Sequence, residues 1–362
     1  MRNTFHVHLT KVQSQLAQQG LTAVLVSSSE NRRYLSGFTG SAGFLFITDE
    51  VAILFTDSRY TQQAINEAPS FEVRQIEKTG WFSSLLKELP TNSRIGYENR
   101  SMTVALFDQL NSSVINVSKS NNTNLSLSAL DGFLDILRSV KSPEEISLIE
   151  QAAQIADKSF ADATSDLKGG ISERELAWQI EMAIHNYGGD GPSFPTIVAS
   201  GPNAALPHHQ PSDKLIQHNE PIVIDMGVLF QGYCSDMTRT LYIGSQDTQF
   251  RTIYDTVLAA QQTAIATVST GMTGSEADSL ARNVINTASY GDYFGHSLGH
   301  GIGILVHEYP TLSPNSDNIL EDNMIFTIEP GIYIKDWGGV RIEDMILLDQ
   351  GTVKILTKSS KI

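Results

Sequence analysis

The sequence predicts an α/β protein of two domains, the second of which contains an internal duplication. Three observations support this. The chain has 362 residues, more than the roughly 100–200 residues of one ordinary domain. Its first part alternates short apolar strands with helical patterns, which is typical of a mixed sheet. In its second part, a pattern of two helices and two apolar strands recurs after roughly a hundred residues.

The first domain is expected to cover residues 1–138. An amphipathic helix ends at Gly20, and the apolar strand TAVLVS follows it. The segments GFLFIT and VAILFT flank a short polar turn and predict a hairpin. Residues 111–128 are rich in Ser and Asn, and we interpret them as surface structure with one short strand in VINVS. Further strands are predicted in FEVRQI and RIGY, and further helices in SRYTQQAINEA and WFSSLLKEL.

The second domain, residues 139–362, begins with a strongly marked helix. Ser142 is the expected N-cap, Pro143 the first helical residue, and the acid three positions after the cap completes a capping box. A second helix opens at Ser172 and ends at Gly188. The apolar segments PIVIDMG and YCSDMTRTLYI then predict strands.

The same order recurs farther along the chain. A helix covers TIYDTVLAAQQTAIATV, and another opens at Thr273 with Glu276 as its capping-box acid. The segments NMIFTIEPGIYI and GGVRIEDMILL follow as strands. Ser172 maps onto Thr273, a shift of 101 residues. Two amphipathic helix pairs often resemble each other by chance, so the acids in the strands carry more of the argument.

Four acids are predicted to lie in strands at related positions of the two halves. Asp225 lies in PIVIDMG, and Asp236 lies on the following strand. Glu329 lies in IFTIEPG, 104 residues after Asp225, and Glu343 in GGVRIEDMILL, 107 residues after Asp236. If the halves pack about a pseudo-twofold axis, four carboxylates converge on one point.

Such convergence predicts a site for cations. Burying carboxylates together is unfavourable because each loses its hydration and repels the others. Two divalent ions balance four negative charges, and a pair of such ions suits hydrolysis. The oxygen-rich donor set favours manganese, cobalt or iron over a thiolate-type zinc site. A single acid in a strand is more often structural, so the prediction depends on the four taken together.

Histidines surround these acids in the sequence. The segment FGHSLGHGIGILVHEYP carries His296, His300 and His307, and ALPHHQ carries His208 and His209. The distance from His208 to His307, 99 residues, is close to the repeat length. HSLGH lacks the Glu of the zincin motif, and the glycines do not form a nucleotide-binding loop. We interpret these glycines as points of close backbone approach to a ligand. Any one of the histidines alone is equally compatible with an ordinary imidazole of the core or surface.

Two further residues share strand parity with the acids. Cys234 lacks a partner base in the sequence pattern, so we interpret it as a small buried residue rather than a nucleophile. Arg341 either orients an acidic ligand or is an ordinary strand-edge cation.

Composition limits the alternatives. The 40 acidic and 25 basic residues give a net charge of -15, which disfavours nucleic acid as a partner. A single cysteine excludes a disulfide framework and a Cys-based zinc site. The first twenty residues lack the apolar run of a signal peptide, and no stretch approaches the roughly 20 apolar residues of a membrane span. A cytoplasmic setting without membrane contact is expected.

Five motifs together resemble the pita-bread metallopeptidases, namely Xaa-Pro aminopeptidase (aminopeptidase P), prolidase and, more distantly, methionine aminopeptidase. They are DMG at Asp225, the acid at Asp236, GHGIG at His300, EPG at Glu329 and RIED at Glu343. In addition, NRRYLSGFTGSAG and LFTDSRYTQQA resemble the amino-terminal domain of the proline-specific branch. The resemblance implies an N-terminal creatinase/aminopeptidase-P-like domain followed by a pita-bread catalytic domain.

The resemblance also implies a centre of two divalent metal ions, with manganese as the first expectation and cobalt or zinc as alternatives. Asp225 is expected to chelate one ion and His300 the other, while Asp236 and Glu343 bridge or share both. Glu329 is expected to be a fifth ligand and to shuttle a proton during catalysis.

The remaining roles follow from the same resemblance. His208 and His307 are expected to contact substrate and to stabilise the tetrahedral intermediate. His296 is expected to line the pocket for proline. Arg341 is included in the expected substrate-binding set because of its position beside Glu343, and not because of the resemblance. His209 departs from the glycine usual after ALPH, and its role is open.

The implied activity is hydrolysis of N-terminal Xaa-Pro bonds by a hydroxide that bridges the two ions, as in Xaa-Pro aminopeptidases. Substrates are then peptides with proline at the second position, and a homodimer is the expected assembly. Prolidase, which is limited to Xaa-Pro dipeptides, is the near alternative. A metal-free creatinase-like peptide-binding module and a dinuclear phosphoesterase are more distant ones.

Overall fold

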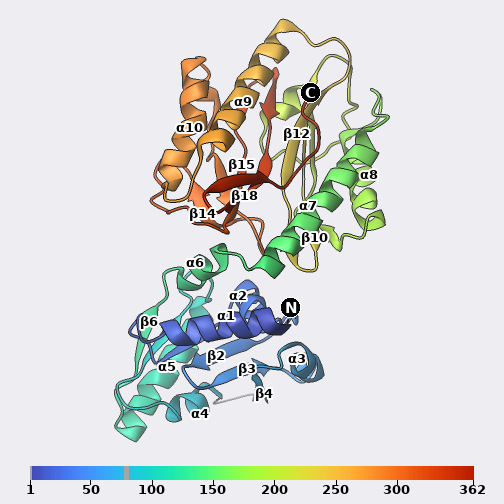
Figure 1. Ribbon diagram of the computed structural model, residues 1–362. Helices are drawn as coiled ribbons and strands as arrows, with labels where there is room; N and C mark the ends of the chain where they lie inside the picture. Colours follow the sequence, from blue (N-terminus) through green and yellow to red (C-terminus); the bar gives the residue numbers. More distant parts are fainter. Residues whose placement is uncertain (1, 77–80) are drawn as a thin grey trace. The chain divides into compact units, whose positions relative to one another are not determined.

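The computed structural model describes residues 2–76 and 81–362. The chain divides into two compact units, Met1–Leu137 and Arg138–Ile362 (Figure 1). The domain boundary expected from the sequence falls between residues 138 and 139. Among the helices of the described ranges, none combines the length and apolar character needed to cross a bilayer.

The first unit is built on a mixed six-stranded sheet in the order β4-β3-β2-β1-β5-β6. The predicted hairpin is confirmed, because β2 pairs antiparallel with β3. Strand β1 pairs antiparallel with β2 and parallel with β5, so both kinds of pairing meet in one sheet. The strands are β1 (Ala23–Val26), β2 (Phe44–Thr48), β3 (Ala52–Thr56), β4 (Glu72–Gln75), β5 (Arg94–Tyr97) and β6 (Ser126–Ala129).

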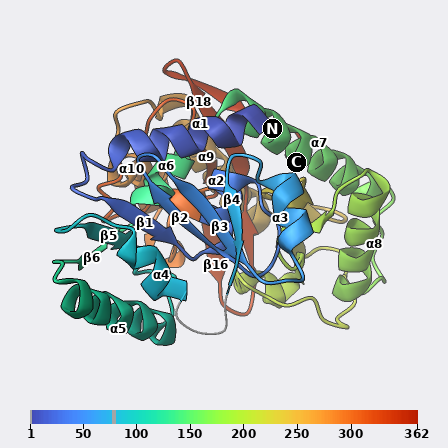
Figure 2. The same cartoon turned by 90° about the horizontal axis from the view of Figure 1, so that it is seen from below.

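Helices cover both faces of this sheet. Figure 2 shows α1 on one side and α4 and α5 on the other. Alternate strand residues such as Leu25 and Ile53 pack against α4 and α5 in one buried cluster. The helices are α1 (Arg2–Gln15), α2 (Ser29–Ser36), α3 (Thr61–Glu67), α4 (Trp81–Lys87), α5 (Val104–Asn121) and α6 (Phe133–Ser139).

Helix α5 contradicts the interpretation of residues 111–128 as surface structure with a strand in VINVS. Leu110, Val114 and Val117 recur at helical spacing and are buried. Thr103 caps the helix by accepting from the backbone amide of Leu106. Although Ser and Asn have modest helix propensity, burial of one narrow apolar face outweighs it.

The second unit contains the predicted pairs of helices. The capping box of Ser142 with Glu145 is confirmed, and so is that of Thr273 with Glu276. Ser172 also caps its helix, by accepting from the amide of Glu175. The helices are α7 (Pro143–Thr164), α8 (Glu173–Asn186), α9 (Thr248–Thr267) and α10 (Gly274–Thr287), with short 3₁₀ helices η1 (Gly201–Ala205) and η2 (Gly291–Tyr293).

Each helix pair is followed by a long hairpin whose two arms are interrupted. In the first half, β9 pairs antiparallel with β12 and β10 with β11. In the second half, β15 pairs with β18 and β16 with β17. The first-half strands are β7 (Gly191–Pro192), β8 (Ile197–Ser200), β9 (Pro221–Met226), β10 (Val228–Phe230), β11 (Tyr233–Cys234) and β12 (Met237–Tyr242). The second-half strands are β13 (Gly299–Gly301), β14 (Glu308–Leu312), β15 (Ile325–Ile328), β16 (Gly331–Ile334), β17 (Gly338–Arg341), β18 (Asp344–Asp349) and β19 (Thr352–Ile355).

The two halves place their helices on opposite sides of the strands (Figure 1). Buried residues of α7 and α8 form one core with β8, β9 and β10. Residues of α9 and α10 form another core with the second-half strands. The hairpins meet between these layers, where the Glu343 amide donates to the Thr238 carbonyl at 3.1 Å. The predicted duplication of helix, helix and hairpin is confirmed.

Candidate metal centre

The four predicted acids lie on the two interrupted hairpins. Asp225 lies near the end of β9. Asp236 lies between β11 and β12, Glu329 between β15 and β16, and Glu343 between β17 and β18. The prediction that all four lie within strands is therefore wrong for three of them. Because a strand turns its side chains alternately to two faces, a break lets an acid face the interior without displacing its buried apolar neighbours.

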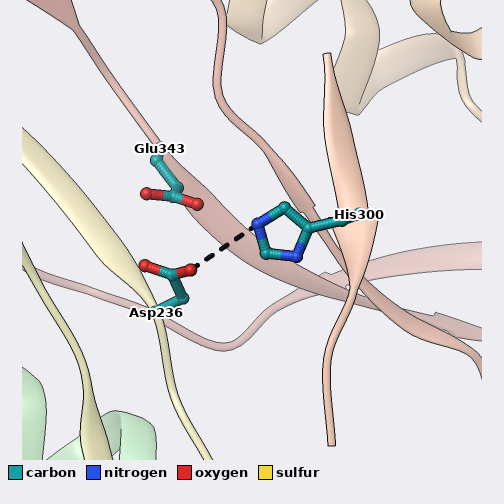
Figure 3. Close-up of side chains that lie close together, drawn as sticks. All are labelled: Asp236, His300 and Glu343. Atoms are coloured by element: carbon teal, nitrogen blue, oxygen red, sulfur yellow. Dashed lines mark ion pairs between the residues drawn. The ribbon is translucent and has the colours of Figure 1, made fainter. Parts of the chain in front are cut away.

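Three predicted residues offer ligand atoms to one small space. Asp236, His300 and Glu343 each have a donor atom within 4.8 Å of the others, and all three are buried. Figure 3 shows the two carboxylates and the imidazole turned toward one another. The Nε2 atom of His300 also lies 3.4 Å from Oε1 of Glu329. Residues from both halves of the unit therefore surround one point.

Asp225 stands beside this group and is held by Arg341. The guanidinium donates from Nη2 to Oδ2 of Asp225 at 2.6 Å, and from Nε to the Thr238 hydroxyl at 3.1 Å. Thr238 in turn donates to Oε2 of Glu343 at 2.7 Å. Arg341 and Thr238 thereby link one acid of the first half to one acid of the second.

The acids repel one another in a buried space. Burial, followed by the charges of Glu343, Asp225 and Glu329, raises the pKa of Asp236 well above its ordinary value. The pKa of Glu329 is raised well above the usual range by burial and then by Glu343. Burial and the charge of Asp225 raise the pKa of Glu343 to about 8. A cluster of this kind favours either protonation or bound cations.

The surroundings of His300 favour its neutral form, which is the form that binds a metal ion. Burial, and then the charge of neighbouring His307, lowers its pKa to about 4. Its Nδ1 lies 3.2 Å from the Gly301 carbonyl, which can only accept, so the proton belongs on Nδ1. The lone pair of Nε2 then faces the carboxylates, as a metal-binding imidazole requires.

The donor set fits divalent cations. Oδ1 of Asp225 and Oδ1 of Asp236 are buried and have no hydrogen-bond partner among the described residues. An unpartnered buried carboxylate oxygen is costly unless something else binds it. Carboxylate oxygens with one imidazole match hard or borderline divalent ions such as Mn²⁺, and no thiolate is part of the group.

The predicted histidines lie around the cluster. The ring of His307 lies 4.2 Å from that of His300, between centroids. Burial, and then the charge of His208, lowers the pKa of His307. His208 and His296 line a pocket of 400 Å³. The residues lining this pocket are Pro207, His208, Asp292, Tyr293, Gly295, His296 and Tyr333.

A chain of hydrogen bonds connects this pocket to Asp225. Arg341 donates from Nη1 to the Tyr333 hydroxyl at 2.9 Å, and Tyr333 lies 3.0 Å from Nε2 of His296. Because Nδ1 of His296 bonds the Ser297 carbonyl, Nε2 is the acceptor and Tyr333 the donor. Burial, and then the charge of Arg341, lowers the pKa of His296 to about 4. The pocket therefore contains a neutral, oriented imidazole.

Sequence reasoning missed the polar residues that hold the acids. Thr238 bonds Glu343, and the Thr327 hydroxyl lies 3.4 Å from Oε1 of Glu329. Tyr333 was missed as well. Each of the two threonines lies two positions from a predicted acid. In an extended chain such residues face the same side, and this spacing is the sequence pattern that marks the threonines as candidates.

The glycines around His300 allow close packing of neighbouring backbone. A Cβ atom on Gly299 would lie 1.9 Å from the Thr327 carbonyl oxygen, and one on Gly301 would lie 2.1 Å from that of Tyr309. Both glycines therefore approach neighbouring backbone closely, and the predicted approach to a ligand stays a prediction. These glycines let β13 lie tightly between its neighbours and so place His300.

The structure shows the surroundings of Cys234 and His209, the two residues to which the sequence assigned no role in the site. Cys234 is buried, as expected, and its sulfur lies 3.5 Å from the Ile304 carbonyl oxygen. His209 contacts an acid outside the cluster, because its Nε2 lies 2.9 Å from Oε2 of Glu173 at the start of α8.

The chain matches two family models. Residues 147–350 match the metallopeptidase family M24, and residues 8–140 match the creatinase/prolidase N-terminal domain. The fold and the buried cluster of acids and histidine are those of a metal-dependent peptidase with the pita-bread fold. The chain belongs to metallopeptidase family M24.

Similar proteins extend over nearly the whole chain. An Xaa-Pro dipeptidase of Pyrococcus horikoshii is 38% identical over 95% of each chain. The solved structure of an Xaa-Pro dipeptidase from Bacillus anthracis has a TM-score of 0.91, 35% identity and 99% coverage of both chains. That of an X-Pro aminopeptidase from Thermotoga maritima has a TM-score of 0.83, 36% identity and coverage of 95% of this chain and 97% of the other.

Proposed function

We propose that the protein hydrolyses Xaa-Pro bonds and that Xaa-Pro dipeptides are its preferred substrates. The observation that carries this proposal is the similarity, across both units, to proteins described as Xaa-Pro dipeptidases. The sequence alone favoured trimming of longer peptides and kept prolidase as the alternative. The comparisons support that alternative better.

We further propose that five residues hold two divalent cations, with manganese as first choice and cobalt or zinc as alternatives. The proposed ligands are Asp225, Asp236, His300, Glu329 and Glu343. The raised pKa values of three of these acids and the two unpartnered oxygen atoms support the assignment. Bound cations of this kind polarise a carbonyl group and lower the pKa of water.

The side chains of this protein have separate tasks in the proposed reaction. Glu329 accepts a proton from the attacking water and passes it to the leaving proline nitrogen. His208 and His307 donate ring N–H groups to the oxygen on which negative charge develops. His296, oriented by Tyr333, forms a wall for the proline ring. Arg341 holds Asp225 in place through its ion pair.

The test compares dipeptides with longer peptides. Protein stripped of metal and reloaded with Mn²⁺ is given Ala-Pro, Ala-Pro-Ala and Ala-Ala, and product release is followed by chromatography. We expect kcat/KM for Ala-Pro to exceed that for Ala-Pro-Ala by about tenfold or more, with Ala-Ala uncleaved. Absence of alanine release from both Ala-Pro and Ala-Pro-Ala would remove the proposal.

One observation favours Xaa-Pro aminopeptidase as the second candidate. The residues lining the pocket include Asp292 and no Lys or Arg. Arg341 already donates to Asp225 and Tyr333. A dipeptide brings a free carboxylate that lacks a cationic partner among these lining residues, whereas proline in a longer peptide brings a neutral amide. A preference for Ala-Pro-Ala in the same assay would establish this candidate.

The homodimer and the cytoplasmic location stay predictions.

A further inference from the structure

Glu173 is a buried carboxylate outside the acid cluster. It is the first residue of α8 and is 0% exposed. Its hydrogen-bond donors are the backbone and hydroxyl of Ser200, the amide of Asn203, the ring of His209, and the backbone and hydroxyl of Ser212. Although burial opposes ionisation, these hydrogen bonds, that of Ser212 foremost, lower its pKa to about 2. The group is therefore a fixed anion at neutral pH.

The donors lie at the two ends of one segment, residues 200–212. Ser200 and Asn203 lie at its start, and His209 and Ser212 near its end. A single carboxylate therefore closes the segment into a loop, at distances of 2.7–3.2 Å.

The middle of this loop lies at the proposed substrate site. His208 lines the pocket together with His296. The carbonyl of Pro207 accepts from Arg341 at 3.4 Å. A Cβ atom on Gly339 would lie 2.2 Å from the Ala204 carbonyl oxygen, so η1 rests directly against β17. The loop is packed on the strand that carries Arg341.

His208 has no hydrogen bond to its ring among the described residues, and it is exposed. Its position therefore depends on the backbone on either side. The next residue, His209, has a side chain that is only 12% exposed and is bonded to Glu173. Rotation of the backbone at His208 would break that bond.

We propose that Glu173 and His209 are positioning residues that hold loop 200–212 so that His208 faces the substrate. This inference rests on the proposed role of His208 in Xaa-Pro hydrolysis. Glu173 is not the capping-box acid of α8. That acid would stand three positions after the N-cap Ser172, where Glu175 is found, and Ser172 accepts from the backbone amide of Glu175. Its hydrogen bonds go to the loop instead. His209 supplies the contact nearest in sequence to the reacting side chain.

A double-mutant cycle tests the proposal with Mn²⁺-loaded enzyme and Ala-Pro. His209→Ala is expected to lower kcat about tenfold with KM changed less than about threefold, because a transition-state contact is misplaced. In a His208→Ala background the same substitution is expected to change kcat less than about twofold, because its effect passes through His208. An equal loss in both backgrounds would overturn the proposal.

Two variants separate positioning from a general loss of structure. His209→Gln keeps an N–H donor for Glu173 and is expected to recover kcat to within about threefold of wild type. Glu175→Gln is the matched control. Glu175 is exposed in the same first turn of α8, and its hydrogen bond to Ser172 uses the backbone amide, which the substitution keeps. It is expected to leave kcat unchanged. Failure of His209→Gln to recover activity would count against the proposal.

Amide hydrogen exchange gives a readout that does not need activity. In Glu173→Gln and His209→Ala, exchange at residues 201–209 is expected to accelerate by about tenfold or more, while exchange in α9 and α10 stays unchanged. Unchanged exchange in the loop would overturn the proposal. Accelerated exchange in a protein that cleaves no Xaa-Pro substrate would instead refute the proposed function and leave the anchoring intact.

Discussion

At the scale of single residues, the acid cluster opposes folding unless cations occupy it. Asp236 is 5% exposed, its Oδ1 has no hydrogen-bond partner among the described residues, and neighbouring acids repel its charge. Such a residue is retained for binding rather than for stability.

Asp236→Asn therefore separates stability from function. Removal of the charge is expected to stabilise the metal-free protein by about 1–3 kcal/mol, because the amide needs no counter-charge. The same variant is expected to lose Mn²⁺ binding and Xaa-Pro hydrolysis. Urea unfolding of chelator-treated wild type and variant measures the first effect. A metal-free variant less stable than wild type would show that the acid contributes to folding by itself.

Glu173 is expected to act in the opposite direction. Its pKa of about 2 lies below the ordinary value of 4.5, so its ionised form stabilises the folded state. This stability is fully present above pH 4.5 and is lost as the pH falls toward 2. Relative to Glu173→Gln, the advantage of wild type is on the order of 3 kcal/mol at pH 7 and shrinks below pH 4.5. Urea unfolding of both metal-free proteins at several pH values checks this; a pH-independent difference would contradict it.

Residue types predicted the acids and histidines of the site but not what supports them. Asp236, Glu343 and His300 do converge. Thr238 and Tyr333 were not predicted, because their importance lies in specific hydrogen bonds. Thr238 bonds Glu343, 105 residues farther along the chain, and Tyr333 bonds Arg341, 8 residues farther. One sequence contains no direct signal for such pairings.

At the scale of elements, local signals predicted helix starts well and polar helices poorly. Both capping boxes were found from sequence because the bonds join residues three positions apart. Helix α5 was missed because its apolar face is only a narrow row that includes Leu110, Val114 and Val117. Whether a row of that kind is buried depends on the sheet that it meets, which the local sequence does not show.

The caps give a prediction for related elements of the two halves. Thr273→Ala and Ser172→Ala each remove the side-chain acceptor at the start of the second helix of a pair, and each is expected to destabilise the protein by about 1 kcal/mol. The melting temperature Tm should fall by roughly 2–4 °C in both variants, as measured by thermal unfolding. A loss in one variant only would mean that the two helix pairs are not equivalent.

At the scale of the whole molecule, the duplication places the site. Asp225 and Glu329 are 104 residues apart, and Asp236 and Glu343 are 107 apart. The repeat length was readable from the sequence, and it predicted that the acids would meet between two similar halves. The breaks in the hairpin arms were not readable, because they arise where the two hairpins meet and the Glu343 amide bonds the carbonyl of Thr238.

The central claim is that both halves together bind a pair of cations. The most direct measurement is metal content per chain after chelator treatment, titration with Mn²⁺ and removal of unbound ion. We predict about two tightly bound ions per wild-type chain and one or fewer in Asp236→Ala. Saturated wild-type protein that retains no Mn²⁺, Co²⁺ or Zn²⁺ would contradict the claim.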